Sequence, residues 1–136
     1  MALKVSLKAD ERILVGGAAI KNISGRTAML LIENEVPLLR EKEIMTEKEA
    51  DTPCRRIYLL TQLMYVDGSN LAKYHKLYWK LAREIIQAAP STLGLFEIVS
   101  EHIYNAKYYH ALKEIRKIIQ YEQKATTNAL KPNKRI

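Results

Sequence analysis

Cysteine is almost absent from this sequence of 136 residues, in which Cys54 stands alone. A single thiol cannot form an internal disulfide, which fits a protein of a reducing compartment. The sequence also has no apolar run of about 18 residues, so we expect neither a membrane-spanning helix nor a membrane partner. Near the N-terminus, Lys4 and Lys8 interrupt the apolar residues, which argues against a secretory signal. We therefore expect a cytoplasmic protein.

Patterns typical of enzyme active sites and metal centres are missing as well. The three histidines lack the i, i+4 spacing of paired metal ligands on a helix. Gly16-Gly17 is not followed by the sequence of a nucleotide-binding loop. Cys54 stands beside two arginines, which lower the pKa of a thiol in principle, but an inert cysteine is the simpler interpretation. We expect no enzymatic activity, no metal and no cofactor.

Positive charge is what the sequence has in excess, with a formal net charge of +7. Residues 1–45 hold seven Lys/Arg and six Asp/Glu, and residues 46–106 hold seven of each. Residues 107–136 hold eight Lys/Arg and two Asp/Glu, so nearly all of the excess lies there. A concentrated basic segment attracts polyanions such as nucleic acids. Solubility alone is the alternative explanation of this charge.

The first 45 residues alternate between apolar and polar positions or form short apolar runs, as β-strands do. The predicted strands are residues 3–8, 13–15, 18–23, 28–32 and 38–39. Gly16-Gly17 suits a tight reversal, and Ser24-Gly25 is a hairpin signal. Pro37 places the last strand at a sheet edge. We therefore predict a small antiparallel β subdomain over residues 1–45.

Residues 46–125 instead carry apolar residues at every third or fourth position, which predicts helices. Thr52-Pro53 is typical of a helix start, with threonine as the N-cap and proline at the first helical position. Pro90 separates two further helical stretches. Four helices with short connections predict an antiparallel bundle, and residues 126–136 predict a basic flexible tail. The predicted fold class is α+β, a small antiparallel sheet followed by a four-helix bundle.

Cations near the strands and on two helices are the candidate RNA-binding residues: Lys4, Lys8, Arg12, Arg40, Arg55, Arg56, Lys113, Arg116 and Lys117. The first four lie on or near the first and last strands, where neighbouring strands would bring them close enough to grip a phosphate. The two central arginines begin a helix, whose free N–H groups suit a phosphate, although the acidic residues before them could pair with them. On the last helix, Lys113 and Lys117 share one face with Lys124, and Arg116 lies alongside. For each group the alternative is an ordinary solvated face.

Tyrosine is used unevenly, since it accounts for eight of the ten aromatic residues. Tyr74 and Tyr78 are one helical turn apart, as are Tyr104 and Tyr108. A tyrosine combines an apolar ring with a polar tip, which suits a bundle core near the surface. Stacking on nucleic-acid bases is the alternative role of these rings.

Several sequence blocks, in order, resemble the FlbT family of flagellar biosynthesis repressors of α-proteobacteria. The blocks are Leu7-Lys8, Glu11-Arg12-Ile13, Leu39-Arg40-Glu41-Lys42-Glu43-Ile44, Thr52-Pro53, Arg56-Ile57-Tyr58-Leu59, Met64-Tyr65 and Ala111-Leu112-Lys113-Glu114-Ile115-Arg116. The similarity covers nearly all of residues 1–125. It implies a post-transcriptional regulator that binds the 5′ untranslated region of flagellin mRNA and promotes degradation of that message, although family members can also act positively.

The resemblance leaves other partners open. Flagellin, or another flagellar regulator, is the alternative partner, and the protein would then be an interaction module or a chaperone-like assembly factor. A homodimer is also open.

The first 45 residues are similar to the carbon-storage regulator family CsrA/RsmA as well. Asp10–Gly16 resembles its Gly-Glu-x-Ile-x-Ile-Gly motif, with Asp10 in place of the first glycine, and Leu38-Leu39-Arg40 resembles the start of its last strand. This resemblance implies an RNA-binding edge that includes Val5, Leu7, Lys8 and Arg40. Leu7 stands where that family has a basic residue, so neither its GGA preference nor its interlocked dimer is carried over.

Overall fold

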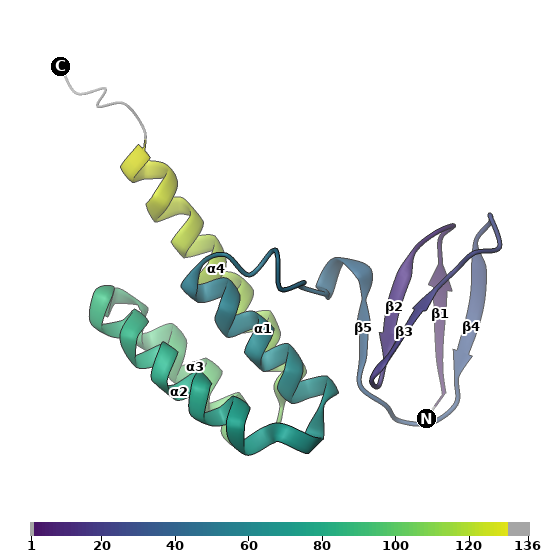
Figure 1. Ribbon diagram of the computed structural model, residues 1–136, viewed down its shortest axis with the longest axis horizontal. Coiled ribbons are helices and arrows are strands. Elements are labelled where there is room, and N and C mark those ends of the chain that lie inside the picture. Colours follow the sequence, from purple (N-terminus) through teal and green to yellow (C-terminus); the bar gives the residue numbers. More distant parts are fainter. Residues whose placement is uncertain (1, 131–136) are drawn as a thin grey trace. The chain divides into compact units, whose positions relative to one another are not determined.

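The computed structural model describes residues 2–130, which form two compact units. One unit comprises the chain up to Ile44 together with Tyr65–Ser69, and the other comprises Met45–Met64 together with the chain from Asn70 onward. We call them the sheet unit and the helical unit. Five strands precede four long helices along the chain (Figure 1), so the predicted α+β class is confirmed. None of the described helices is long and apolar enough to cross a membrane.

The strands of the sheet unit form two small antiparallel sheets. The strands are β1 (Leu3–Leu7), β2 (Arg12–Val15), β3 (Ala18–Lys21), β4 (Ala28–Ile32) and β5 (Leu38–Arg40). In one sheet β1 pairs with β4, and in the other β2 lies between β3 and β5. The strand positions therefore follow the alternating pattern of the sequence. β5 lies at a sheet edge, as the proline before it predicted.

The two glycine-containing turns have different outcomes. Gly16 has a φ of +60° and forms the turn between the paired strands β2 and β3, which confirms the predicted reversal. The hairpin predicted at Ser24-Gly25 is wrong, because β3 and β4 belong to different sheets. The chain there is held by Asn22, whose side-chain amide donates to the carbonyl oxygens of Leu7, Lys8 and Arg26 at 3.1, 3.0 and 2.8 Å.

The core of the sheet unit draws side chains from both sheets. Val5 and Leu7 on β1 and Ile13 on β2 are buried, and Leu30 and Ile32 of β4 pack against them. Alternation of side chains along each strand puts these residues on inward faces. Burial of this shared core therefore holds the two small sheets together.

The helices are α1 (Pro53–Val66), α2 (Leu71–Ala88), α3 (Leu93–Tyr104) and α4 (Tyr108–Leu130), with short 3₁₀ turns η1 (Glu41–Glu43), η2 (Gly68–Asn70) and η3 (Pro90–Thr92). At the start of α1, the Thr52 hydroxyl accepts the Arg55 N–H at 3.2 Å, so the predicted N-cap is confirmed. α4 continues past residue 125, where loss of the apolar period had predicted a tail, to Leu130. Residues 131–136 of the expected tail lie outside the described part of the chain.

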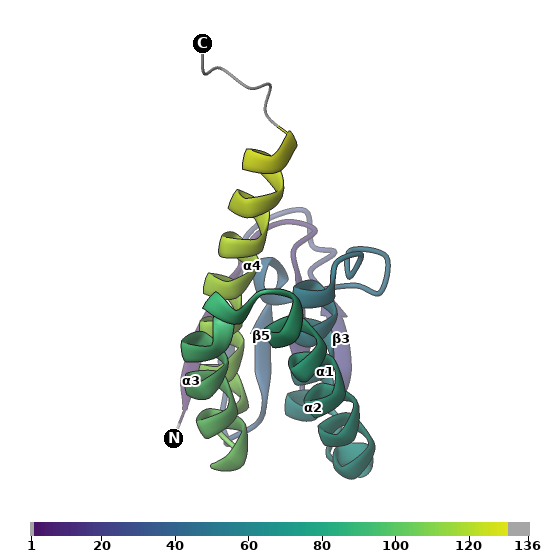
Figure 2. The same ribbon diagram turned by 90° about the vertical axis from the view of Figure 1, so that its left-hand side faces the viewer.

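Tyrosine hydroxyls join the helices of the bundle to one another. Four such bonds run between Tyr58 and Arg116, Tyr78 and Ser100, Tyr108 and His75, and Tyr121 and Ser91. The Tyr78 ring is fully buried, and Figure 2 shows the helices that these bonds connect. A buried ring with a bonded hydroxyl is a core group. The core interpretation is therefore confirmed for the buried Tyr58 and Tyr78, whereas Tyr121 is 43% exposed and is not a core residue.

Candidate nucleic-acid interface

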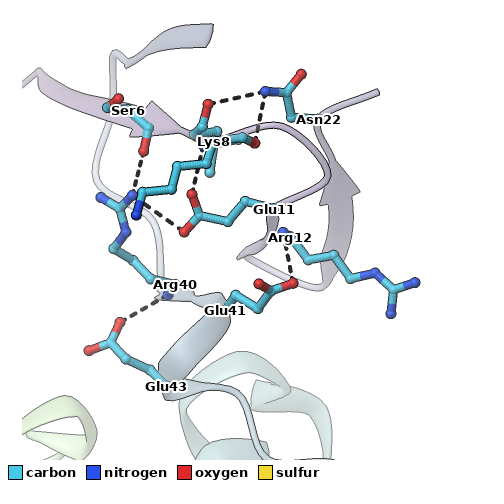
Figure 3. A network of polar contacts seen from close by, with 9 residues as sticks. Ser6, Lys8, Glu11, Arg12, Asn22, Arg40, Glu41 and Glu43 are labelled. Carbon is cyan, nitrogen blue, oxygen red and sulfur yellow. Dashed lines mark hydrogen bonds and ion pairs between the residues drawn. The ribbon is translucent and has the colours of Figure 1, made fainter. Parts of the chain in front are cut away.

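Arg40 lies at the end of β5, where it connects the two sheets. Its guanidinium donates to the backbone oxygen of Ser6 on β1 and lies 3.6 Å from a carboxylate oxygen of Glu11 (Figure 3). Its own N–H donates to Glu43 Oε1 at 2.9 Å. Arg40 is therefore a structural residue of the sheet unit as well as a candidate RNA contact.

Glu11 is the carboxylate that lies against the Arg40 guanidinium in this network. Its Oε1 accepts the Lys8 N–H at 2.8 Å. That hydrogen bond, with a further contribution from the Arg40 charge, lowers the pKa of Glu11 below its ordinary value. Hydrogen bonds to the ionised form favour that form. Glu11 is therefore a carboxylate at neutral pH, and it partly neutralises the cations around it.

A hollow of about 710 Å³ opens beside Arg40 and Glu11. Its charged lining residues are three cations and three carboxylates: Lys8, Arg40, Lys42, Asp10, Glu11 and Glu41. Figure 3 shows Lys8 and Arg40 on the same side of the network. The structure thus brings these two predicted residues together. The mixed charge of the lining disfavours a phosphate deep in the hollow, so an RNA strand would meet the cations at its rim.

The other two candidates of the sheet unit lie away from this hollow. The Arg12 N–H donates to Glu41 at 3.2 Å, but its guanidinium extends away from the network (Figure 3). Lys4 is exposed on β1 opposite Leu31 of β4. A strand rises about 3.3 Å per residue, so Lys4 is about 13 Å from Lys8 along the chain. The cations therefore follow β1 and its turn rather than meeting at one point.

Two residues of the second resemblance are not available at the surface. Val5 is 3% exposed and Leu7 is 1% exposed. Both side chains belong to the core between the sheets. The implied edge contacts of Val5 and Leu7 side chains are therefore wrong for this chain, and the reason is the inward alternation of β1.

At the start of α1, the two candidate arginines differ in their surroundings. Arg55 forms an ion pair with Asp51 at 2.7 Å, and this contact is the main cause of the lowered pKa of Asp51. The acidic residues before the helix therefore do pair with one of the arginines. Arg56 is exposed and forms no ion pair within the described residues.

The three candidates of α4 also differ. Lys117 pairs with Glu114 at 3.1 Å. Arg116 is half-buried and donates to the Tyr58 hydroxyl at 3.2 Å, so it fastens α4 to α1. Lys113 is exposed, and its ammonium lies 5.0 Å from the centre of the Tyr109 ring. This helix therefore presents one strongly exposed candidate cation that has no carboxylate partner in residues 2–130.

Sequence reasoning missed a further row of cations on α2. Lys73, Lys76, Lys80 and Arg83 are exposed and follow a three–four–three spacing. Residues at this spacing share one helix face. This spacing is visible in the sequence and could have identified them. It places the four residues on the polar side of α2, away from its apolar stripe. We call these four residues the α2 cation row.

Cys54 has the properties of an inert thiol. It is buried at the start of α1, where its N–H donates to Glu122 Oε2 at 3.3 Å. Burial, with a smaller effect of Glu122, raises the pKa of the Cys54 thiol to about 12. A thiol rather than a thiolate is therefore present at neutral pH. Residues 2–130 also contain no group of three or more His, Cys, Asp or Glu placed to hold a metal ion.

Comparison with known proteins identifies relatives over nearly the whole chain. The model of the family described as "Flagellar protein FlbT" matches residues 3–126. A probable flagellum biosynthesis repressor protein FlbT 1 of Bradyrhizobium diazoefficiens is 43% identical over 91% of this chain and 84% of its own.

Two further relatives carry similar names. A probable flagellum biosynthesis repressor protein FlbT of Rhodopseudomonas palustris is 42% identical over 90% of this chain and 96% of its own. The flagellum biosynthesis repressor protein FlbT of Caulobacter vibrioides is 33% identical over 90% and 87%. No solved structure matches the chain.

Proposed function

Since the chain belongs to the FlbT family of flagellar proteins, we propose that it represses flagellum biosynthesis by binding RNA. Its target would be the 5′ untranslated region of flagellin mRNA, and binding would promote degradation of that message. The names of the relatives support the flagellar role. The charges of the sheet unit and of the last helix support the RNA target.

The observation that carries the RNA proposal is that five of the nine candidate cations are exposed and form no ion pair within residues 2–130: Lys4, Lys8, Arg12, Arg56 and Lys113. An unpaired cation on the surface can replace the counterions of a phosphate. Three of the five lie on or next to β1 and β2, and one of these, Lys8, lies beside the Arg40 guanidinium (Figure 3). The network around Arg40 and Glu11 would fix the backbone from which these side chains project.

The mechanism would be non-catalytic. The cationic side chains would hold the leader RNA and block access of the ribosome. The message would then be open to cellular nucleases. The inert environment of Cys54 fits this proposal, since the chain would supply binding and no chemistry. Most of the affinity would come from phosphate contacts and would fall steeply with salt.

Gel-shift titration of a flagellin leader RNA at two salt concentrations tests the proposal. The double variant Lys8→Ala, Arg12→Ala removes two exposed cations and leaves the Arg40–Glu11 contact in place. We expect weaker binding and a salt slope smaller by about one unit for each phosphate that is no longer neutralised. Message half-life in cells should lengthen in parallel.

The matched control is Lys48→Ala, Lys107→Ala, which removes the same charge from two exposed residues of the helical unit. This control should keep the affinity and the salt slope of the unaltered protein. Equal affinity of both double variants would contradict the assignment to the sheet unit. A tight complex with flagellin that excludes the leader would favour the protein-interaction alternative.

A further inference from the structure

Helices α2 and α3 lie side by side on one side of the helical unit (Figures 1 and 2). The short turn η3 joins them, and the Tyr78 hydroxyl on α2 lies 3.1 Å from the Ser100 hydroxyl oxygen on α3. Tyr78 and Phe96 are buried, so each helix presents its opposite side to solvent. The outward sides of α2 and α3 therefore form one surface, which we call the α2–α3 face.

The α2 part of this face is basic and partly apolar. It carries the α2 cation row, while Glu84 is the one acidic residue of the helix. Trp79 lies beside the row and is 41% exposed. Leu77 is equally exposed, but together with Lys80 it lines a hollow between α1 and α2. Trp79 is the single tryptophan of the sequence. Large exposed apolar side chains beside a charged row are typical of an interaction surface.

The α3 part of the face has the opposite charge. The sequence of α3 contains Glu97 and Glu101, one turn apart and exposed, and no Lys or Arg. Its exposed apolar residues are Leu93, Ile98 and Tyr104, which are 48%, 45% and 86% exposed. An acidic, partly apolar helix therefore lies next to a basic, partly apolar one.

The two sets of charges do not neutralise each other within the protomer. Lys76 and Lys80 of α2 form no ion pairs in the described part of the chain. The same is true of Glu97 and Glu101 of α3. We propose that the α2–α3 face binds the same face of a second copy of this chain. A two-fold axis would place the basic α2 of each protomer against the acidic α3 of its partner, so that each charge set is matched twice.

The chemistry of the face favours a second copy over RNA. A phosphate backbone would approach the α2 cation row but would be repelled by Glu97 and Glu101 on the adjacent helix. Exposed Leu93 and Ile98 would gain nothing from phosphates, whereas they would be buried against another protein. A surface that carries both charges and an apolar middle is complementary to itself under a two-fold rotation.

The size of the face predicts a weak dimer. The 12 residues of α3 span about 18 Å, and two helices are about 20 Å wide, so the face measures about 360 Å² in projection. A standard interface buries about 800 Å² per partner. We therefore expect a weak dimer that is populated only at high protein concentration, and electrostatic complementarity would set its specificity.

Charge reversal on one helix at a time tests the proposal by analytical ultracentrifugation without RNA. In the acidic variant, Lys76→Glu, Lys80→Glu, both α2 and α3 are acidic. In the basic variant, Glu97→Lys, Glu101→Lys, both helices are basic. Each variant alone should sediment as a monomer over a concentration range in which the unaltered protein dimerises. Mixed in equal amounts, they should form a heterodimer, because each helix then meets one of opposite charge.

Trp79 supplies an independent signal. Its fluorescence should shift to shorter wavelength as the unaltered protein is concentrated, and again when the two variants are mixed. The control variant Lys21→Glu, Lys48→Glu makes the same charge change away from the face and should still dimerise. Circular dichroism establishes that all variants are folded.

Three outcomes would overturn the proposal: a monomeric unaltered protein at all concentrations, dimerisation of either charge variant alone, or no heterodimer in the mixture. The proposal is independent of the proposed RNA target, because no RNA is present in the experiment.

Discussion

The guanidinium of Arg40 lies 3.6 Å from the carboxylate of Glu11 and donates a hydrogen bond to the backbone of Ser6. This contact joins the end of β5 to the turn after β1, and therefore one sheet to the other. The same arginine is a candidate RNA contact. Loss of Arg40 would thus change both the fold and the binding surface, and it cannot serve alone as a test of RNA binding.

Acid should weaken the sheet unit through Glu11. The pKa of Glu11 is lowered in the folded protein, first by the Lys8 N–H and then by Arg40. The ionised carboxylate therefore stabilises the fold at pH values above its ordinary pKa of 4.5, and this contribution is lost as pH falls through the lower folded value. Glu11→Gln should flatten the fall of the urea midpoint between neutral pH and about pH 3. Superimposable profiles of the two proteins would contradict this role.

Asn22 should be among the most sensitive polar positions. Its amide donates to three carbonyl oxygens, and its Oδ1 accepts both the N–H and the hydroxyl of Ser24 at 3.0 and 2.8 Å. Asn22→Ala would leave one buried and several part-buried polar groups unpaired and should lower the free energy of unfolding by about 3 kcal/mol. Chemical denaturation measures this change in the free energy of unfolding. Lys21→Ala, at an exposed neighbour, should stay within about 0.5 kcal/mol of the unaltered protein.

Gly16 and Gly17 form a matched pair for a backbone test. Gly16 has a φ of +60°, whereas Gly17 has no positive φ and an added Cβ there would have no atom within 4 Å. Gly16→Ala should therefore destabilise by about 1 kcal/mol or more, because an L-residue is strained in the left-handed region. Gly17→Ala should be nearly neutral. Equal denaturation midpoints for the two variants would show that the turn relaxes to another conformation.

Alkali should destabilise the helical unit through Tyr78. Burial raises the pKa of Tyr78 from 10.0 to about 12. Between these values the unfolded chain releases the phenolic proton while the folded protein retains it, so the free energy of unfolding falls as pH rises.

Tyr78→Phe should lower stability by about 1 kcal/mol at neutral pH, through loss of the Ser100 bond, and should make the alkaline fall shallower. Tyr104→Phe, at a residue that is 86% exposed, is the control and should change neither quantity. Denaturation midpoints from pH 8 to about pH 11 would measure both effects. An unchanged alkaline slope in Tyr78→Phe would contradict the assignment.

Cys54 should react slowly with iodoacetamide in the folded protein. Its pKa is raised to about 12, mainly by burial, so little thiolate is present at pH 8. Unfolding in urea should restore the rate of an ordinary thiol. Glu122→Gln should leave the folded protein slow to react, since Glu122 is a lesser cause than burial. Rapid labelling of the native protein would contradict the inert interpretation.

Local patterns predicted the elements of the fold well. Alternation located β1, and Thr52-Pro53 located the start of α1, because both signals depend on neighbouring residues alone. The partner of each strand was not predictable in this way. The sequence at Ser24-Gly25 favours a hairpin, but the side chain of Asn22 bonds back to the end of β1 and directs the chain into the other sheet.

The sequence predicted which cations belong to the candidate site, but not which of them are paired with other residues of the protein. Arg40 meets Glu11, and Arg116 meets Tyr58, through contacts between residues far apart in the sequence. No local rule identifies such partners, so the sequence could not distinguish exposed cations from cations that contact another residue. The α2 cation row differs from these cases, because its helical spacing is visible in the sequence and depends on no distant partner.

Asn22 also affects how the sheet unit opens. A two-stranded sheet of this size is marginal on its own, so without further contacts its amide protons would exchange through local openings separate from those of the other sheet. One side chain that bonds the end of β1 and the loop before β4, from a position just after β3, couples those openings. Amides of both sheets should then exchange with a common opening free energy, as a single cooperative unit.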